Sequence, residues 1–151
     1  EAAVRMLLKI LRSWFDYVVL DTPLDLSHVA SVLLESQVVL LLLTPNPMAL
    51  QAAETTLAAL KQHGLSTSQV WPVLNMFKPE DYAFRNKIGE ALGLPIAANL
   101  FWSPRVLAQA EASQQPLILA QPQSDLAMAI QSLAANIAQS AARPAAEGTR
   151  A

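Results

Sequence analysis

The feature that most constrains the fold is an unbroken apolar run, Val38–Leu43, closed by the prolines of Thr44-Pro45-Asn46-Pro47. Its six residues are too few to cross a bilayer, because a spanning helix needs about 20. A short apolar run bounded by turn residues is typical of a strand buried on both faces of a parallel sheet. Proline ends such a strand because it has no N–H donor. We therefore predict a buried parallel strand here.

Further extended segments are predicted on both sides of this run. Apolar and β-branched residues bounded by turn residues indicate them at Tyr17–Leu20, Val70–Met76, Pro95–Phe101 and, more briefly, Pro116–Leu119. Because Pro72 cannot donate a hydrogen bond, regular pairing of its strand is expected only from Val73.

Helices are predicted between these strands. Apolar residues at helical spacing open the chain at Val4, Leu7, Leu8 and Leu11, with Arg5, Lys9 and Arg12 on the other side. Further helices are expected at Leu26–Ser36, Met48–His63, Asp81–Leu92 and Ser103–Ser113, and a last one carries the stripe Leu126, Ile130, Leu133 and Ile137. Strands alternating with helices indicate an α/β fold of three layers (αβα), a parallel sheet with helices on both faces.

Charge and composition exclude several classes of function. The chain has 10 Lys and Arg against 12 Asp and Glu, and no Lys or Arg lies between Arg12 and Lys61 or between Arg105 and Arg143. Without a basic stripe, direct nucleic-acid binding by this chain is not expected. It has no cysteine and only two isolated histidines, which argues against disulfides, thiolate zinc sites and histidine metal sites.

Asp21 is the strongest candidate for chemistry. It follows the predicted strand Tyr17–Leu20 directly, and ligands of open α/β sheets bind at the carboxyl ends of the strands. A carboxylate there holds Mg²⁺ through water, while Thr22 and Pro23 begin a loop beside a γ-phosphate. The simpler alternative is that Asp21 only begins a turn, because Asp and Pro are common turn formers.

Five motifs in order resemble the ParA/MinD superfamily of deviant Walker A ATPases, over roughly Met6 to Ala138. They are an apolar strand with Asp21-Thr22-Pro23, Val38–Thr44 with Pro45, Val73-Leu74-Asn75, Leu94-Pro95-Ile96 with Asn99–Val106, and Pro116-Leu117-Ile118 with Pro122-Gln123-Ser124. The resemblance implies a parallel sheet of the P-loop NTPase (SIMIBI) type. It also implies ATP and Mg²⁺ as cofactors and a homodimer that forms on ATP binding.

The resemblance also implies roles for single residues. Asp21 is the expected catalytic residue and ligand of Mg²⁺ through water, with Thr22 and Pro23 beside it. Asn75 is expected to contact adenine, or else to cap a loop. The adenine loop corresponds to Trp102, Ser103, Pro104 and Arg105. Trp102 either stacks on the base or lies in the core, and Arg105 either pairs with phosphate or a dimer partner or is solvated.

Within the superfamily, the single proline after Asp21 and the leucine-rich strand look most like the CpaE/TadZ branch, which is associated with type IV/Flp pilus assembly. Such a protein is expected to be cytoplasmic, with partners that recruit it to the membrane or a cell pole. Partition ATPases, septum-site ATPases and a non-hydrolysing localisation scaffold are the alternatives. No basic amphipathic helix follows Ile137, so this chain is not expected to carry a membrane anchor.

One part of the family pattern is absent. A Walker A loop needs glycines whose N–H groups cradle phosphates and a lysine for the terminal oxygens, but no Gly-Lys pair occurs in the chain. The chain is therefore not expected to hydrolyse ATP alone. In the family the strand before that loop lies between the two strands predicted at Tyr17–Leu20 and Val38–Leu43, so a gap with unpaired backbone groups is expected there. Residues 1–141 are interpreted as the carboxyl-terminal part of an ATPase domain and 142–151 as a flexible tail; alternatively, another chain fills the gap.

Overall fold

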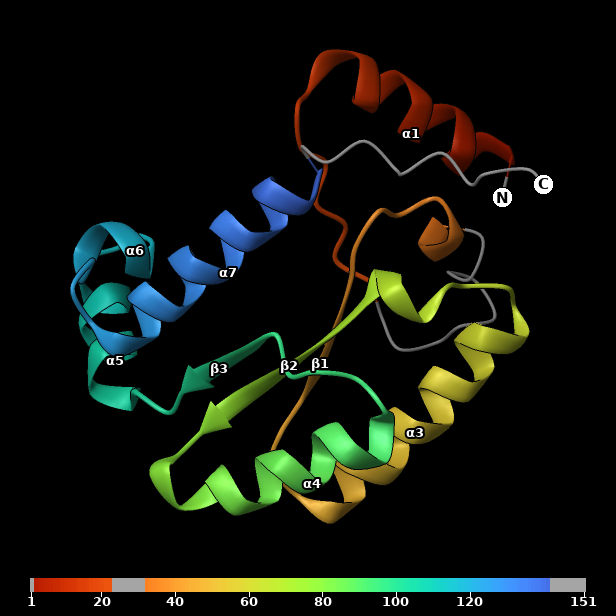
Figure 1. The fold of residues 1–151 in the computed structure, drawn as a ribbon. Coiled ribbons are helices and arrows are strands. Elements are labelled where there is room, and N and C mark those ends of the chain that lie inside the picture. Colours follow the sequence, from red (N-terminus) through yellow and green to blue (C-terminus); the bar gives the residue numbers. More distant parts are fainter. Residues whose placement is uncertain (1, 23–31, 142–151) are drawn as a thin grey trace.

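A three-stranded parallel sheet between helices is the centre of the computed structural model, which describes residues 2–22 and 32–141 (Figure 1). The strands lie in the order β1 (Val39–Leu43), β2 (Val70–Phe77) and β3 (Ala98–Phe101). The helices are α1 (Ala2–Trp14), α3 (Pro47–Gln62), α4 (Tyr82–Leu92), α5 (Pro104–Ala112), α6 (Leu117–Ala120) and α7 (Asp125–Ala141), with 3-10 turns η1 (Thr67–Gln69) and η2 (Pro79–Asp81).

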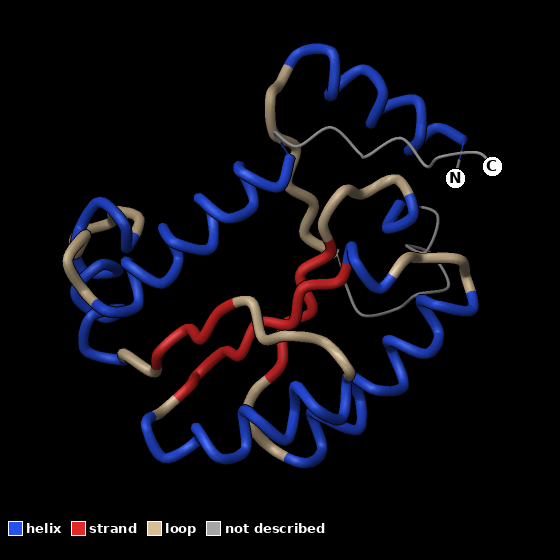
Figure 2. The backbone as a smooth tube through the Cα atoms, in the orientation of Figure 1, coloured by secondary structure: helices blue, strands red, loops and turns tan. Residues whose placement is uncertain are grey.

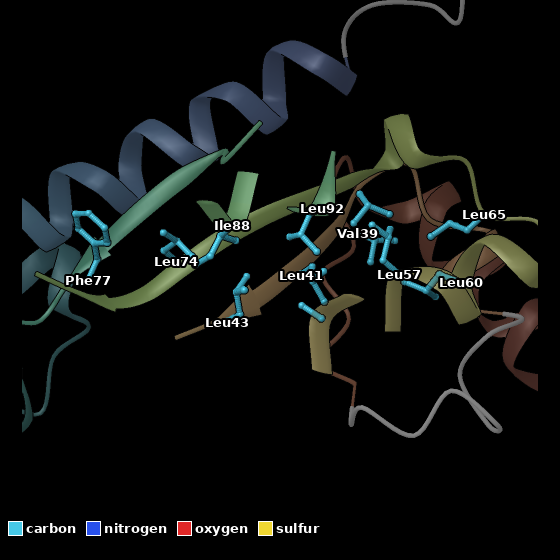
Figure 3. Packing of buried hydrophobic residues seen from close by; sticks show 12 residues of the cluster. Val39, Leu41, Leu43, Leu57, Leu60, Leu65, Leu74, Phe77, Ile88 and Leu92 are labelled. Atoms are coloured by element: carbon cyan, nitrogen blue, oxygen red, sulfur yellow. The ribbon is translucent and has the colours of Figure 1, made fainter. Parts of the chain in front are cut away.

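Helices cover both faces of the sheet, as predicted. Helices α3 and α4 pack on one face, and α7 crosses the other face over β3 (Figures 1 and 2). The first of these layers encloses the core (Figure 3), where Leu74 and Ile88 are fully buried beside Leu41 and Leu57. The expected α/β fold with a parallel sheet is confirmed.

The prediction that β1 is buried on both faces is wrong. Val39, Leu41 and Leu43 point into the core, but Leu40 and Leu42 are 37% and 55% exposed. The reason is that α7 packs on β3, two strands away, and leaves this side of β1 open.

The predicted strand at Tyr17–Leu20 is not formed. These residues run as a loop between α1 and the rest of the molecule (Figure 2), and Val19 is 92% exposed. A strand requires a neighbour that accepts and donates its backbone hydrogen bonds. Among residues 2–22 and 32–141, β1 pairs with β2 alone, and a cavity separates the loop from the other edge of β1.

The effect of Pro72 is confined to one side of β2. Pairing with β1 already begins at Val70, opposite Val39, and not at Val73 as predicted. Pairing with β3 does begin at Val73, opposite Ala98. The carbonyl of Pro72 accepts a hydrogen bond from Ala97 N at 2.8 Å. Because the nitrogen and the carbonyl of one strand residue point to the same side, the Pro72 nitrogen, which has no hydrogen to donate, also faces β3. This also explains why β3 is shorter than the predicted Pro95–Phe101.

The extended piece predicted at Pro116–Leu119 is a helical turn, α6. The Pro116 carbonyl accepts hydrogen bonds from the amides of Leu119 and Ala120. Proline at the start of a helix loses no hydrogen bond, because its position needs no N–H donor. The segment thus forms its backbone hydrogen bonds within one helical turn and not with a neighbouring strand.

The other predicted helices are confirmed in α1, α3, α4, α5 and α7. Leu8 is buried in α1, whereas Val4 and Leu7 of its predicted apolar face are exposed. Pro23, the tail 142–151 and the first part of the helix predicted at Leu26–Ser36 lie outside the described residues; of its described part, residues 32–34 are helical. Within the described part, every helix falls short of the length and apolar content that a bilayer crossing requires.

Two glycines of α4 predict opposite effects of alanine. Gly93 ends the helix at φ +63°, where a side chain costs about 1–2 kcal/mol. Gly89 lies inside the helix, where its added Cβ meets the Leu94 carbonyl at an ordinary 3.4 Å and alanine gains about 0.5–1 kcal/mol. In thermal unfolding, Gly93→Ala should lower the midpoint and Gly89→Ala should raise it. A lower midpoint for both would contradict this reading of the helix end.

Candidate functional site

The carboxyl ends of the three strands meet at one edge of the sheet (Figure 1) because all pairing is parallel. Asn75 lies just before the end of β2, and Trp102 directly follows β3. Asn75 is half-buried and Trp102 is 46% exposed. The structure thus places an amide and a large aromatic ring on neighbouring strands at the edge where α/β sheets bind ligands.

The end of β2 has an unusual backbone. The pairing of β2 with β3 shifts register between Leu74 and Phe77, and Met76 has φ +56°. Asn75 Oδ1 accepts a hydrogen bond from Met76 N at 2.9 Å. An amide oxygen has a second lone pair, and none of the hydrogen bonds among the described residues uses the Asn75 amide nitrogen. Asn75 therefore retains both N–H donors and one acceptor lone pair, and a donor beside an acceptor is the combination that recognises an adenine edge.

Aromatic contacts hold this edge in place. The Phe77 ring packs edge-on against Tyr82 at 5.0 Å and against Phe101 at 5.8 Å between centroids. The Phe77 carbonyl accepts a hydrogen bond from Trp102 N at 2.9 Å. Together these contacts join the ends of β2 and β3 to the start of α4, and they fix where the Trp102 backbone leaves the sheet.

Helix α5 begins directly after Trp102. Ser103 is its N-cap residue, and its carbonyl accepts a hydrogen bond from Leu107 N at 3.1 Å. Pro104 is the first helical residue, a position that suits proline. Ser103 makes no side-chain cap hydrogen bond, and Arg105 is exposed. Ser103 itself is half-buried, and both residues follow Trp102 closely in the sequence.

Asp21 and Thr22 lie elsewhere. They line a cavity of about 820 Å³ beside β1, whose lining includes Leu40 and Leu42 but neither Asn75 nor the Trp102–Arg105 segment. Asp21 is exposed and Thr22 half-buried. Since Tyr17–Leu20 is not a strand, Asp21 is not at a strand end as predicted. The structure brings residues 102–105 and Asn75 to one edge and leaves Asp21 and Thr22 apart from them.

The donor chemistry of Asp21 fits Mg²⁺ but no dedicated metal cage. Among residues 2–22 and 32–141, no group of three or more His, Cys, Asp or Glu side chains is placed to hold a metal ion. Mg²⁺ usually keeps several waters and binds through one or two carboxylates plus substrate phosphates. A single accessible carboxylate is compatible with that mode, in which the nucleotide supplies the other oxygens.

Sequence reasoning missed two polar features near the sheet. Asn46 Nδ2 donates to Thr44 Oγ1 at 2.6 Å and Asn46 Oδ1 accepts from Ala49 N at 2.9 Å, which caps α3 just after β1. Arg85 Nε donates to Asn99 Oδ1 at 3.3 Å and ties α4 to β3. The turn predicted at Thr44-Pro45-Asn46-Pro47 contains this cap, since Asn immediately before a proline at a helix start is a recognisable N-cap signal.

The positive φ of Met76 predicts a measurable strain. Asparagine tolerates this conformation far better than methionine, so Met76→Asn should stabilise the protein by about 0.5–1 kcal/mol. Gln114, at φ +52° after α5, is the matched control remote from Asn75 in sequence. Gln114→Asn should give a similar gain in denaturant unfolding. If Met76→Asn destabilises while Gln114→Asn stabilises, the methionine side chain contributes packing that outweighs the backbone strain.

Comparisons with known proteins agree with this architecture. The chain matches no family model and no curated protein sequence. It is similar in structure to a ParA family ATPase from Chlorobium tepidum TLS, with TM-score 0.74, 23% identity and coverage of 84% of this chain and 54% of that one.

Two further similar structures are of MinD. For the cell division protein MinD of Aquifex aeolicus, the TM-score is 0.75 at 15% identity, over 89% of this chain and 58% of that one. For the septum site-determining protein MinD of Pyrococcus horikoshii OT3, complexed with Mg-ADP, it is 0.68 at 22% identity, over 89% and 55%. The chain thus spans little more than half the length of these proteins. Its fold is that of the ParA/MinD family ATPases, a P-loop NTPase fold.

Proposed function

We propose that this chain is part of a ParA/MinD-like ATP-binding protein that acts as a nucleotide-switched positioning or assembly factor. The observation that carries the proposal is the likeness in fold to ParA and MinD ATPases over 84% to 89% of the chain. One of these relatives, MinD of Pyrococcus horikoshii, is complexed with Mg-ADP. Asn75 and Trp102 at the carboxyl edge supply the chemistry for a base site.

The proposed switch depends on the γ-phosphate. In the complete protein, Asp21 holds Mg²⁺ through water, and Thr22 and Pro23 contact the phosphate end of ATP. Binding of ATP then favours a homodimer, and Arg105 contacts phosphate or the partner. Where hydrolysis occurs, water is the nucleophile and Asp21 acts through Mg²⁺. Because Walker A is absent from these residues, hydrolysis requires polypeptide that this chain does not contain.

The system served is proposed as type IV/Flp pilus assembly, with a protein of the CpaE/TadZ branch that pilus-assembly partners recruit from the cytoplasm to the membrane or a cell pole. Asp21-Thr22-Pro23-Leu24, with a single proline, is the sequence feature that favours this branch. A non-hydrolysing scaffold with the same fold is the second candidate, favoured by the altered loop Phe101-Trp102-Ser103. A partition or septum-site ATPase is the third.

Removing the Asp21 carboxylate tests the switch. In the complete gene product, Asp21→Ala should weaken Mg-ATP binding by about tenfold, because a contact to a charged group is worth about 1.5–3 kcal/mol. Without Mg²⁺ the variant and the natural protein should bind ATP alike. Asp16, exposed on the same loop, provides the control Asp16→Ala. Equal losses for the two variants in calorimetric titration would exclude a specific role of Asp21.

Truncating Asn75 tests base recognition. Asn75→Ala should reduce the preference for ATP over GTP by about tenfold, because a bidentate base contact is worth about 1–3 kcal/mol. Asn86→Ala removes an exposed amide on α4 whose oxygen accepts a hydrogen bond from Arg85, and it should leave the preference unchanged. If Asn75→Ala weakens both nucleotides equally, Asn75 supports the fold of the edge and does not recognise the base.

A further inference from the structure

One side of α4 forms a shallow pocket with the loop that leads into β3. The core-facing side chains of this helix, Ile88 and Leu92, are buried, and its other side lies on the outer surface of the molecule (Figure 1). The pocket has a volume of about 480 Å³ and is lined by Arg85, Asn86, Gly89 and Glu90 of the helix and by residues 93–96 of the loop. Its lining includes neither Asn75 nor Trp102, so the pocket is separate from the proposed base site.

A glycine lies at the floor of this pocket. A Cβ at Gly89 would meet the Leu94 carbonyl oxygen at 3.4 Å and Ile96 Cγ1 at 3.9 Å, so the loop passes close to the bare backbone of the helix. In the described part of the chain, the Leu94 carbonyl accepts no hydrogen bond. Because a carbonyl oxygen is an acceptor with two lone pairs, the floor of the pocket offers an acceptor to an incoming N–H group.

The walls of the pocket carry opposite charges. Arg85 Nε donates to Asn99 Oδ1 at 3.3 Å and Arg85 Nη1 donates to Asn86 Oδ1 at 3.5 Å. A guanidinium has five N–H donors, so three remain, with at least one on each terminal nitrogen. Such a pair of donors fits a carboxylate. Among the described residues, neither Arg85 nor Glu90 forms a salt bridge, so each charge is available to a partner.

The order of the four helix residues makes this face its own complement when it is reversed. Arg85 and Glu90 lie at equal distances from the middle of the stretch and have opposite charges. Asn86 and Gly89 lie at equal distances inside them, and one has a projecting amide where the other has no side chain. A two-fold axis across a helix places it antiparallel to its copy, so that residue i contacts j and j contacts i. The face therefore meets the requirement of a two-fold interface between identical chains.

We propose that this face of α4 binds a second copy of the chain, with the two α4 helices packed antiparallel across a two-fold axis. Arg85 of each copy pairs with Glu90 of the other. Asn86 of each copy enters the other pocket at Gly89, where its amide reaches the Leu94 carbonyl. Small residues let two helix backbones approach closely. This contact goes beyond the homodimer of the proposed function, because it involves neither a nucleotide nor the carboxyl edge of the sheet.

The two charges decide which occupant fits. An anionic occupant such as a phosphate, a lipid headgroup or a nucleic acid would pair with Arg85 but would also meet the exposed carboxylate of Glu90. A cationic occupant would meet the opposite conflict, and like charges placed together suppress a wrong partner. A partner that presents both charges in reversed order satisfies both residues, and the chain itself carries that order.

The size of the face sets the expected affinity. Helix α4 has 11 residues, and a contact between one short helix and a loop is expected to bury less than about 1,200 Å², which is the range of weak and transient complexes. We therefore expect a dissociation constant on the order of 10–100 μM. Because the interface depends on ion pairs at the surface, its affinity should fall as the salt concentration rises.

Charge reversal in the complete protein, measured by sedimentation velocity without nucleotide, tests the proposal. Arg85→Glu and Glu90→Arg each place like charges opposite one another, and each should weaken self-association at least about tenfold. An equimolar mixture of the two variants should associate at least as tightly as the natural protein, because every pair is then of opposite charge. Lys87→Glu is the matched control, since Lys87 is exposed on α4 but does not line the pocket, and it should leave association unchanged. Because no nucleotide is added, the outcome is independent of whether the proposed ATP site exists.

Alanine at Gly89 provides a second measurement that separates association from folding. The added methyl group occupies the space that Asn86 of the second copy requires, so Gly89→Ala should weaken self-association at least about threefold. The same variant is expected to raise the thermal midpoint, because alanine favours the helix. A weaker dimer in a more stable protein cannot result from loss of the fold. Thermal unfolding also serves as the folding check for Arg85→Glu, which removes the hydrogen bond to Asn99.

Three results would overturn the proposal. One is a natural protein that stays monomeric up to about 1 mM, well above the expected dissociation constant. The second is self-association that both charge reversals leave unchanged, which would mean that the copies meet through another surface. The third is a mixture of the two folded variants that fails to associate, which would leave the face to a partner of different sequence.

Discussion

Parallel backbone pairing between β1, β2 and β3 is the interaction on which the rest of this structure depends. It brings three strand ends to one edge, and it turns Leu41, Leu43 and Leu74 toward α3 and α4 to form the core. Parallel strands require long connections, which the helices supply while they cover the faces. Where pairing stops, at the outer edge of β1, burial stops as well, and Leu40 and Leu42 are left exposed.

The geometry of the candidate base site is a consequence of the same pairing. The register shift and the positive φ of Met76 occur where β2 leaves the ladder. The next residue, Phe77, is buried in the core and contacts Phe101. The strained backbone of Met76 therefore lies directly beside a residue that packing holds in place. Strain of this kind persists only where the surroundings hold it, and the aromatic contacts of Phe77 provide that support for Asn75.

The sequence predicted those features that depend on local signals. The apolar run with Pro45 and Pro47 located β1, and Gly93 located the end of α4 at its left-handed turn. Tyr17–Leu20 has equally strong strand character, yet it is a loop because no strand of the described part of the chain pairs with it. Pairing is a long-range property, and so is the separation of Asp21 from Asn75. Pro72 interrupts pairing only on the side that faces β3. Which side that is depends on the register of the strands, and the residue types around Pro72 do not determine the register.

We propose that this fold binds adenine nucleotide as a ParA/MinD-like protein does. Calorimetric titration of the complete gene product with ATP and GTP, each with and without Mg²⁺, tests it most directly. The account predicts saturable binding of ATP with a clear preference over GTP and a strengthening by Mg²⁺. Absence of binding for every nucleotide, in a protein shown to be folded, would contradict the account and leave only the shared fold.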